Sequence, residues 1–270
     1  MKLDLVIHDG REEVVDFARR FISKAQNGGL SVVAKPQNAG LAEAATLVQG
    51  PPDMVAAIGG DGTMLAAAQI AIEHGIPIFG FNLGTIGFLT EVEPDDVDRV
   101  VDRLAAGEFT TEPRMGITAR LGGSVARGLN DVVVEKIDSL RLIHMEVEID
   151  GEPFVTYRAD GLIVATPTGS TAYNFSAGGP LVDHSIQALM MTPVASHSLF
   201  SRTMVLPPDS VIRVTVRRQR PARISVDKVP LGEADEGEVV EISRTRDPLQ
   251  FVRFDHLSFA RAVNEKFSLG

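Results

Sequence analysis

A glycine-rich turn stands between an apolar run and a helix-like segment. Residues 54–58 are typical of a buried strand, Gly59-Gly60-Asp61-Gly62 follows at once, and residues 63–74 have helical character. Glycine lets the backbone approach a ligand closely, and a helix start offers unpaired N–H groups and the positive end of a dipole. We therefore expect a phosphate site at Gly59, Gly60 and Gly62. The carboxylate of Asp61 would repel phosphate there unless it does chemistry or meets a metal.

Strand-like and helix-like segments alternate through the first hundred residues. Short connections between such segments indicate a parallel sheet covered by helices. Ligands of these sheets bind at the carboxyl ends of the strands, which is where the Gly-Gly-Asp-Gly turn lies. The expected strands are 3–7, 30–34, 54–58 and 76–79, and the expected helices are 14–25, 41–48, 63–74 with Gly75 as its end, and a last one from Pro94 to Gly107.

Short alternating strands with turn signals replace this pattern after about residue 110. They indicate an all-β second domain of stacked sheets. We expect an α/β domain with a parallel sheet over 1–108, the all-β domain over 109–254, and a helical segment over 255–270 that packs back on the first domain. The strands predicted in the second domain are 132–135, 143–149, 154–157, 161–165, 212–216, 223–227, 238–242 and 249–253.

Composition excludes several classes of protein. The net charge of −10 argues against a nucleic-acid partner or a polybasic membrane surface. The absence of cysteine excludes disulfides, thiolate catalysis and cysteine-ligated zinc. The six histidines show no metal-ligand spacing, so we expect no metal held by the protein alone. The first residues do not resemble a signal peptide and no apolar stretch approaches 18 residues, which predicts a soluble, cytoplasmic protein.

Two further segments could belong to the same site. The loop 80–88 contains glycines and follows the next strand, so it should open on the same sheet edge as Asp61. Segment 160–180 combines a strand with five Ser/Thr hydroxyls, four glycines, Tyr173 and Asn174. Such a density of hydroxyls and amides suits sugar hydroxyls, phosphates and an adenine edge. The structural alternatives are ordinary turns, with Asp61 as a helix N-cap.

These motifs together resemble the bacterial NAD kinases, in the correct order over roughly residues 55–230. The resemblance rests on Gly-Gly-Asp-Gly, the loop ending at Gly87-Phe88, the pair Asn130-Asp131, and Asp160-Gly161 leading into the Thr-Pro-Thr-Gly-Ser-Thr-Ala-Tyr segment 166–173. The turn alone is shared with diacylglycerol, sphingoid and phosphofructokinase relatives, whereas segment 166–180 is specific to this family. The resemblance implies the NAD kinase fold and a homodimer or homotetramer.

The resemblance also implies roles for single residues. Asp61 would be the catalytic base that takes the proton from the 2′-hydroxyl of the adenosine ribose of NAD as that oxygen attacks the γ-phosphorus of ATP. Asp131 would bind ribose hydroxyls, Asp160 would contact the nicotinamide end, and Tyr173 would stack on the substrate. Asp227 matches a family aspartate whose role stays open. The full set implied to bind NAD is Asp61, Gly62, Phe88, Asn130, Asp131, Arg141, Arg158, Asp160, Thr171, Ala172, Tyr173 and Ser176.

The chemistry agrees with this interpretation. Phosphoryl transfer needs positioning and charge neutralisation, which the glycine amides and a Mg²⁺ brought with ATP would supply. No Gly-x-x-x-x-Gly-Lys-Ser/Thr and no Gly-x-Gly-x-x-Gly occurs, so the chain is neither a P-loop kinase nor a typical dinucleotide-binding dehydrogenase. Two alternatives remain open: a Gly-Gly-Asp-Gly kinase of a lipid or sugar, and a non-catalytic NAD(P) sensor. Whether polyphosphate replaces ATP, and NADH replaces NAD, is also open.

Overall fold

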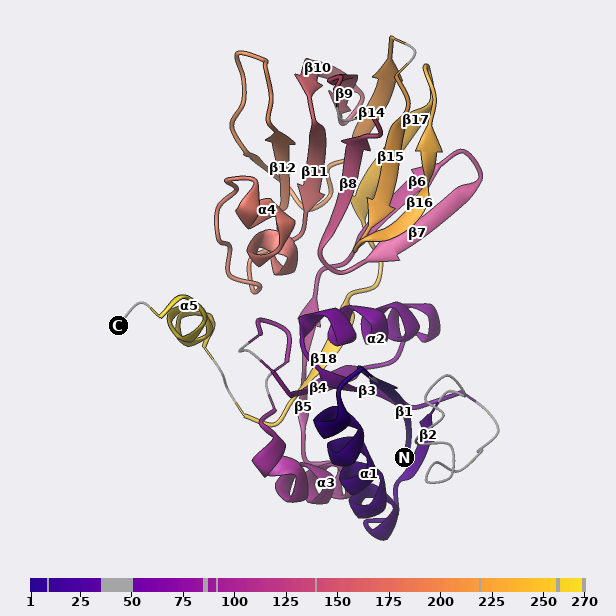
Figure 1. The fold of residues 1–270 in the computed structure, drawn as a ribbon, viewed down its shortest axis with the longest axis vertical. Helices are drawn as coiled ribbons and strands as arrows, with labels where there is room; N and C mark the ends of the chain where they lie inside the picture. The colour runs from indigo at the N-terminus through magenta and orange to yellow at the C-terminus, as the bar shows by residue number, and fades with distance from the viewer. Residues whose placement is uncertain are drawn as a thin grey trace. The chain divides into compact units, whose positions relative to one another are not determined.

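The chain folds into two compact units, one made of Met1–Pro113 with Leu249–Gly270 and the other of Arg114–Pro248 (Figure 1). The computed structural model describes residues 1–8, 10–34, 51–84, 87–90, 92–138, 140–218, 220–255 and 258–268. The helix expected over 41–48 lies outside these residues. The units differ from the boundaries expected at 108 and 254, because residues 109–113 and 249–254 belong to the first unit and not to the all-β part.

The first unit contains a six-stranded sheet. Its strands, in spatial order, are β2 (Ser31–Ala34), β1 (Lys2–Ile7), β3 (Met54–Gly59), β4 (Ile78–Asn82), β18 (Leu249–Arg253) and β5 (Thr110–Arg114). Strands β2, β1, β3, β4 and β18 pair in parallel, as the alternating sequence predicts for the first four. Strand β18 was expected in the second domain, but Phe251 pairs with Ile78 of β4 and is buried in this sheet.

Helices cover both faces of this sheet. Figure 1 shows α1 (Glu12–Asn27) and α3 (Val97–Ala106) on one face and α2 (Asp61–His74) on the other. The apolar stripes of α1 and α3 share one core with β1, β3 and β4. Helices α2 and α3 end at Gly75 and Gly107, whose positive φ angles of 66° and 72° are the left-handed caps that glycine adopts easily. The helix α5 (Phe259–Phe267) is the helical part of the C-terminal segment.

The second unit consists of two antiparallel six-stranded sheets, as the alternating pattern predicts. The first sheet contains, in spatial order, β10 (Glu152–Ala159), β9 (Ile143–Ile149), β14 (Ile212–Arg217), β17 (Val239–Arg244), β6 (Ile117–Leu121) and β7 (Ser124–Gly128). The second contains β13 (Met204–Leu206), β12 (Leu189–Val194), β11 (Gly161–Ala165), β8 (Asp131–Lys136), β15 (Ala222–Val226) and β16 (Val229–Ala234).

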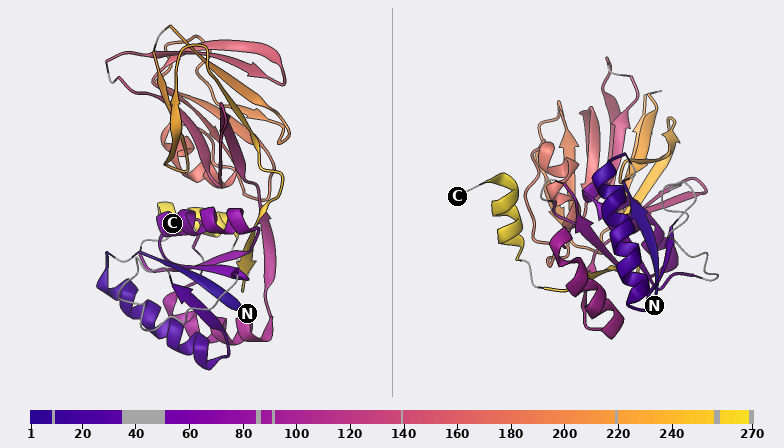
Figure 2. Two further views of the ribbon diagram at one scale, coloured as in Figure 1. Left: turned by 90° about the vertical axis from the view of Figure 1, so that its right-hand side faces the viewer. Right: turned by 60° about the horizontal axis from the view of Figure 1, so that its bottom comes forward.

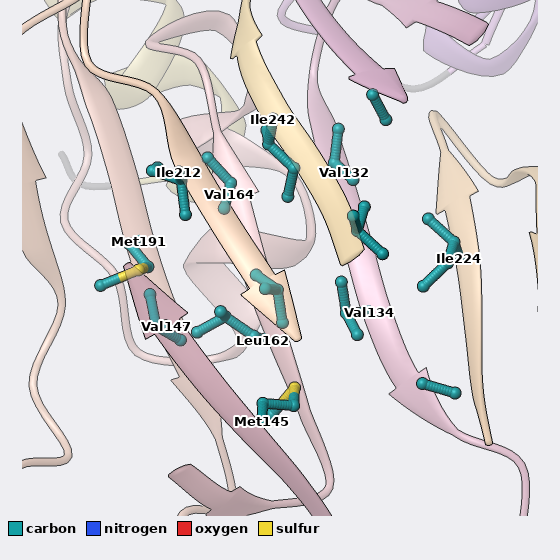
Figure 3. Packing of buried hydrophobic residues seen from close by; sticks show 14 of the residues in the cluster. Val132, Val134, Met145, Val147, Leu162, Val164, Met191, Ile212, Ile224 and Ile242 are labelled. Carbon is teal, nitrogen blue, oxygen red and sulfur yellow. The ribbon is translucent and has the colours of Figure 1, made fainter. Parts of the chain in front are cut away.

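One continuous apolar core lies between these two sheets. Alternate residues of each strand point inward, so that Val132 and Val134 of β8 belong to the same cluster as Met145 and Val147 of β9 (Figure 3). A short helical segment leaves the second sheet after β11: a 3₁₀ turn over Thr168–Thr171 and then α4 (Tyr173–Ser176), which Figure 2 also shows from two other sides. This core fixes the ends of β8, β11 and β15, where the candidate substrate residues lie.

Candidate active site

The Gly-Gly-Asp-Gly turn joins β3 directly to α2. Strand β3 ends at Gly59, Gly60 is the N-cap of α2, and the helix begins at Asp61. The N-cap is Gly60 and, within the described residues, no side chain caps this helix, so the purely structural alternative, with Asp61 as N-cap, is wrong. The amide end of a fourteen-residue helix is therefore not covered by a capping side chain.

The three glycines of the turn are glycine for different reasons. Gly59 has a φ of 154°, and a Cβ atom on it would lie 2.3 Å from Oγ1 of Thr63, so the fold itself requires glycine there. A Cβ atom on Gly60 or Gly62 would meet nothing within 4 Å, and neither residue has a positive φ. Because the fold does not need glycine at Gly60 and Gly62, close approach of a ligand to the backbone is the remaining physical reason for it.

Asp61 connects the turn to the second glycine-rich loop. Its Oδ2 accepts a hydrogen bond from the amide of Phe88 at 3.1 Å, and its Oδ1 accepts one from the amide of Leu89 at 3.0 Å. Gly87 allows this contact, because a Cβ atom on it would lie 2.2 Å from Oδ1 of Asp61. The two glycine loops therefore lie together at one sheet edge, as expected from their positions after β3 and β4. A carboxylate has about four lone-pair sites, so Asp61 keeps the capacity to accept a further proton.

A cavity of about 330 Å³ opens beside Asp61. Its lining includes the glycine turn, the second loop, and three residues outside the motifs found in the sequence: His8, Arg11 and Lys266. Arg11 follows β1, which lies beside β3, and its Nη1 donates to the carbonyl of Leu83 at 2.7 Å. The sequence could have pointed to Arg11, because it follows a strand that is expected beside β3 in a parallel sheet. Lys266 comes from α5 and has no such signal in the sequence.

In the second unit, strand pairing brings three separate motifs to one end of a sheet. Asp131 begins β8 and pairs with Ala165, the last residue of β11, while Val132 pairs with Val226 at the end of β15. The segments that follow, from Thr166 and from Asp227, therefore lie beside the pair Asn130-Asp131. All three belong to the resemblance noted in the sequence.

Asp227 holds the backbone around Asn130 and Asp131. It lies in the tight turn between β15 and β16 with a positive φ of 48°. Its carboxylate accepts hydrogen bonds from the amides of Leu129, Asn130 and Asp131 at 2.6, 2.8 and 3.1 Å. Burial raises the pKa of Asp227, and these three amide bonds oppose that shift. The role that the sequence left open is thus to support the Asn130-Asp131 segment.

Asp131 itself is a buried carboxyl group. Its pKa is raised to about 7, mainly by burial and secondly by the charge of Asp227, while the charge of Lys228 acts in the opposite direction. Its neighbour Asn130 is also buried, and within the described residues its Oδ1 has no hydrogen-bond partner. Buried polar atoms normally have partners, so this pair is suited to receive a polar ligand.

Several polar side chains in the segment after β11 form hydrogen bonds within the second unit and so stabilise the local fold. Thr166 donates from Oγ1 to the carbonyl of Leu129 at 2.6 Å, and Asn174 accepts from Oγ1 of Thr192 at 2.6 Å. Gly169 packs so closely that a Cβ atom would lie 2.1 Å from the carbonyl oxygen of Asn130. The structural alternative therefore holds for part of this segment, including Thr166 and Asn174. The predicted ligand-binding residues Thr171, Ala172, Tyr173 and Ser176 are at least partly exposed.

The other predicted residues lie near this segment to different degrees. The pKa of Tyr173 is raised mainly by burial. The negative charges of nearby carboxylates, Asp160 and Asp131 among them, raise it further. Asp160 forms an ion pair with Lys136 at 2.6 Å, and Lys136 in turn lines a cavity of about 190 Å³ together with Arg141. Arg158 is exposed on the edge strand β10, and its side chain forms no part of that cavity.

Comparison of the sequence with family models decides the family. The model of the ATP-NAD kinase N-terminal domain matches residues 4–109, and that of the ATP-NAD kinase C-terminal domain matches residues 129–254. The chain belongs to the NAD kinase family. The resemblance proposed from the motifs is confirmed, and these two matches follow the α/β and all-β parts of the NAD kinase fold.

Individual NAD kinases match over nearly the whole chain. The "NAD kinase" of Heliobacterium modesticaldum is 37% identical over 282 residues, which cover 98% of each chain. The "NAD kinase 2" of Streptomyces avermitilis is 36% identical over 281 residues, covering 98% of this chain and 93% of its own. These relatives support a phosphotransferase that acts on NAD, and neither a lipid or sugar kinase nor a sensor.

Two solved structures show the same fold at low identity. Yeast NADH kinase complexed with NADH has a TM-score of 0.89 at 24% identity and covers 100% of this chain and 88% of its own. An NAD kinase from Archaeoglobus fulgidus in complex with ATP has a TM-score of 0.73 at 24% identity and covers 100% of both. In this NAD kinase family member, no described helix is long and apolar enough to cross a membrane.

Proposed function

We propose that this protein transfers the γ-phosphoryl group of ATP to the 2′-hydroxyl of the adenosine ribose of NAD and so makes NADP. The observation that carries this proposal is the Asp61 carboxylate, held by two backbone amides at the rim of a cavity with glycine and basic residues around it. A ribose hydroxyl is a weak nucleophile, so a fixed carboxylate that takes its proton is the expected catalytic group.

We further propose that the predicted residues bind the two substrates. The backbone of Gly59, Gly60 and Gly62 would hold phosphates, because amides at the start of α2 are available there. Asn130 and Asp131 would bind ribose hydroxyls, and the partly exposed ring of Tyr173 would stack on the substrate. The remaining proposed NAD contacts are Gly62, Phe88, Arg141, Arg158, Asp160, Thr171, Ala172 and Ser176.

A divalent cation, Mg²⁺ in particular, would enter with ATP and neutralise charge on its phosphates. Among the described residues no group of three or more His, Asp and Glu could hold a metal ion. Asp61 is the one acidic side chain among the described residues that line the cavity of about 330 Å³. This donor set fits a cation that is held mainly by the triphosphate.

We also propose that the protein is a homodimer or homotetramer that works in the cytoplasm, where ATP and NAD are both available. Apolar side chains on two edge strands of the second unit and on the loop beside them support self-association. Phe154 of β10 packs edge-on against Phe200 with ring centroids 5.6 Å apart, and both are exposed, as are Leu199 and Val205.

The test is NADP formation from purified protein, ATP, Mg²⁺ and NAD, measured with an NADP-specific coupled enzyme. The Asp61→Asn variant should lose roughly 10²- to 10⁴-fold in kcat, since general-base catalysis contributes about that much. The matched control is Glu73→Gln, an exposed acid at the far end of the same helix, which should keep the parent rate. No NADP from the parent protein, or equal rates for Asp61→Asn and the parent, would refute the proposal.

A further inference from the structure

We propose that Lys266, near the end of the C-terminal helix α5, binds the phosphates of the donor beside Arg11. This inference rests on the proposed function and adds to it a residue that lies more than two hundred positions away from the glycine turn. Both side chains line the cavity beside Asp61, together with His8. The charges, the docking of α5 and the chemistry of the lining all support it.

The charge of this cavity is opposite in sign to that of the protein. The whole chain carries a net charge of −10, yet among the described residues that line the cavity the charged side chains are Arg11 and Lys266 against the one carboxylate of Asp61. Arg11 also forms an ion pair with Glu13, which lies outside the lining residues. A local excess of positive charge next to the amide end of α2 is what a chain of phosphates requires.

Helix α5 is attached to the same loop that holds Asp61. The ring of Phe267 contacts the ring of Phe88, with centroids 6.1 Å apart, and Nζ of Lys266 lies 6.0 Å from the centroid of Phe88. The amide of Phe88 is one of the two that bind Asp61. Lys266 is therefore positioned by the residue that also positions the proposed base.

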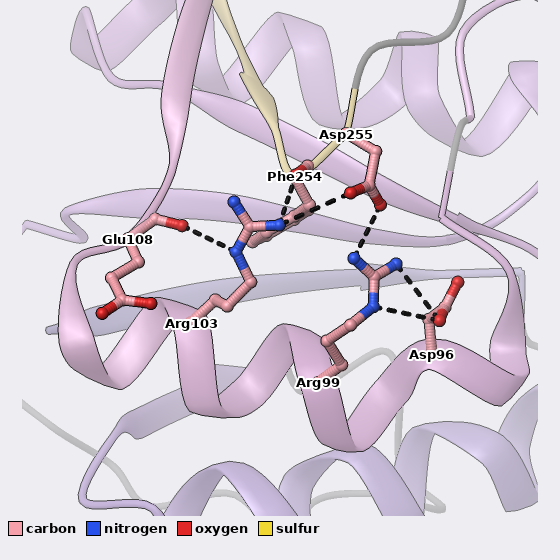
Figure 4. A network of polar contacts seen from close by, with 6 residues as sticks. All are labelled: Asp96, Arg99, Arg103, Glu108, Phe254 and Asp255. Carbon is pink, nitrogen blue, oxygen red and sulfur yellow. Dashed lines mark hydrogen bonds and ion pairs between the residues drawn. The ribbon is translucent and has the colours of Figure 1, made fainter.

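The chain just before α5 is fixed to α3 by a polar network (Figure 4). Nη1 of Arg99 lies 2.7 Å from a carboxylate oxygen of Asp255, and Arg103 donates to the carbonyl of Phe254. Arg103 also donates to the carbonyl of Glu108 at 2.9 Å. The contacts at Phe254 and Asp255 thus fix the chain before α5, while Phe267 in its last turn contacts Phe88.

The lining chemistry points to phosphate rather than to the base of the donor. Leu83 is the one large apolar side chain among the described lining residues, and none of them is a Phe, Tyr or Trp that could stack on a purine. Nucleobases are usually recognised by apolar or aromatic contacts with a few polar groups. We therefore assign this cavity to the polyphosphate chain, with Lys266 as a point charge on it.

The test measures binding of inorganic tripolyphosphate to the full chain by calorimetry, and KM for ATP and for NAD separately. Lys266→Met keeps the apolar stem and removes the charge. We expect it to raise the Kd for tripolyphosphate and the KM for ATP by about tenfold, since a hydrogen bond to a charged group contributes about that much. The KM for NAD should stay the same, and Lys266→Arg should restore both phosphate-dependent values.

The matched control is Arg261→Gln, which removes a positive charge from the same helix. Arg261 is ion-paired with Glu265 at 2.7 Å and does not line the cavity beside Asp61, so its variant should bind tripolyphosphate as the parent does. An unchanged Kd for tripolyphosphate in Lys266→Met, or no binding of it by the parent, would overturn the role of Lys266. Weakened tripolyphosphate binding in a protein that makes no NADP would support Lys266 and refute the kinase proposal alone.

Discussion

A Cβ atom on Gly87 would lie 2.2 Å from Oδ1 of Asp61. The same atom would lie 2.9 Å from Oγ1 of the buried Thr90, so neither neighbour leaves room for it. We expect Gly87→Ala to displace the Asp61 carboxylate and lower kcat by roughly 100-fold, the order that a 1 Å misplacement can cause. Gly123→Ala, where a Cβ would meet nothing within 4 Å, is the control. Full activity of Gly87→Ala would show that the position of Asp61 is not critical.

A substitution of Gly62 should change stability and activity in different directions. Its Cβ would meet nothing within 4 Å and it lies inside α2, where alanine is favoured over glycine by about 0.5–1 kcal/mol. Gly62→Ala should therefore keep or raise the thermal midpoint, while kcat/KM for ATP falls by roughly tenfold or more because the backbone no longer approaches the ligand. Ala66→Gly, at an exposed position of the same helix, should lower the midpoint and keep kcat/KM. A Gly62→Ala variant with parental kcat/KM would contradict the phosphate role of Gly62.

Asp227 should matter for substrate binding without touching substrate. In Asp227→Asn one side-chain oxygen becomes an NH₂ group, which cannot accept a hydrogen bond from the amide of Leu129 or Asn130. We expect a loss of about 1–3 kcal/mol in unfolding free energy, the usual cost of an unpaired buried group, and a raised KM for NAD. Urea unfolding and steady-state kinetics measure the two effects. Asp247→Asn, at an exposed acid, should change neither, and parental values in Asp227→Asn would exclude the supporting role.

Asp131 should make stability depend on pH. Burial raises its pKa in the folded protein to about 7, well above the value of about 3.9 for an unfolded chain. The folded state therefore binds more protons, and the contribution of Asp131 is complete below about pH 4 and is lost as pH rises through about 7.

Asp131→Asn mimics the protonated group at every pH. We expect this variant to be more stable than the parent at pH 8, with a difference that shrinks toward pH 5, as measured by urea unfolding at each pH. Parallel pH profiles for the two proteins would show that Asp131 ionises normally.

Local periodicity was sufficient to predict the alternating first part of the fold. Strands β3 and β4 are continuous apolar runs because helices cover both faces of the sheet, and each of the helices α1, α2 and α3 ends next to a glycine, so these elements can be recognised locally. The expectation that β18 belongs to the second domain is wrong. Its sequence shows a strand, but its partner β4 lies about 170 residues away, and periodicity contains no information about partners.

The candidate site could be predicted only where one residue type is required locally. Gly59 and Gly87 mark close backbone approaches, and Asp61 stands out because it is a charge among glycines. Lys266 could not be found in this way, since a lysine near a chain end has the same local pattern as any solvated lysine. Thr166 and Asn174 were selected for their polar groups, yet those groups serve the backbone of their own turn. The sequence shows that a hydroxyl is present but not what it bonds.

Strand β18 lies between β4 and β5 in the first sheet, while the whole segment Arg114–Pro248 comes between β5 and β18 in the chain. The ribosome therefore synthesises β18, an inner strand of the first sheet, only after the entire second unit. The first sheet lacks the strand between β4 and β5 until the segment Arg114–Pro248 has been synthesised. Folding on the ribosome should thus finish out of sequence order, and translation must pass Lys266 before the cavity beside Asp61 can be complete.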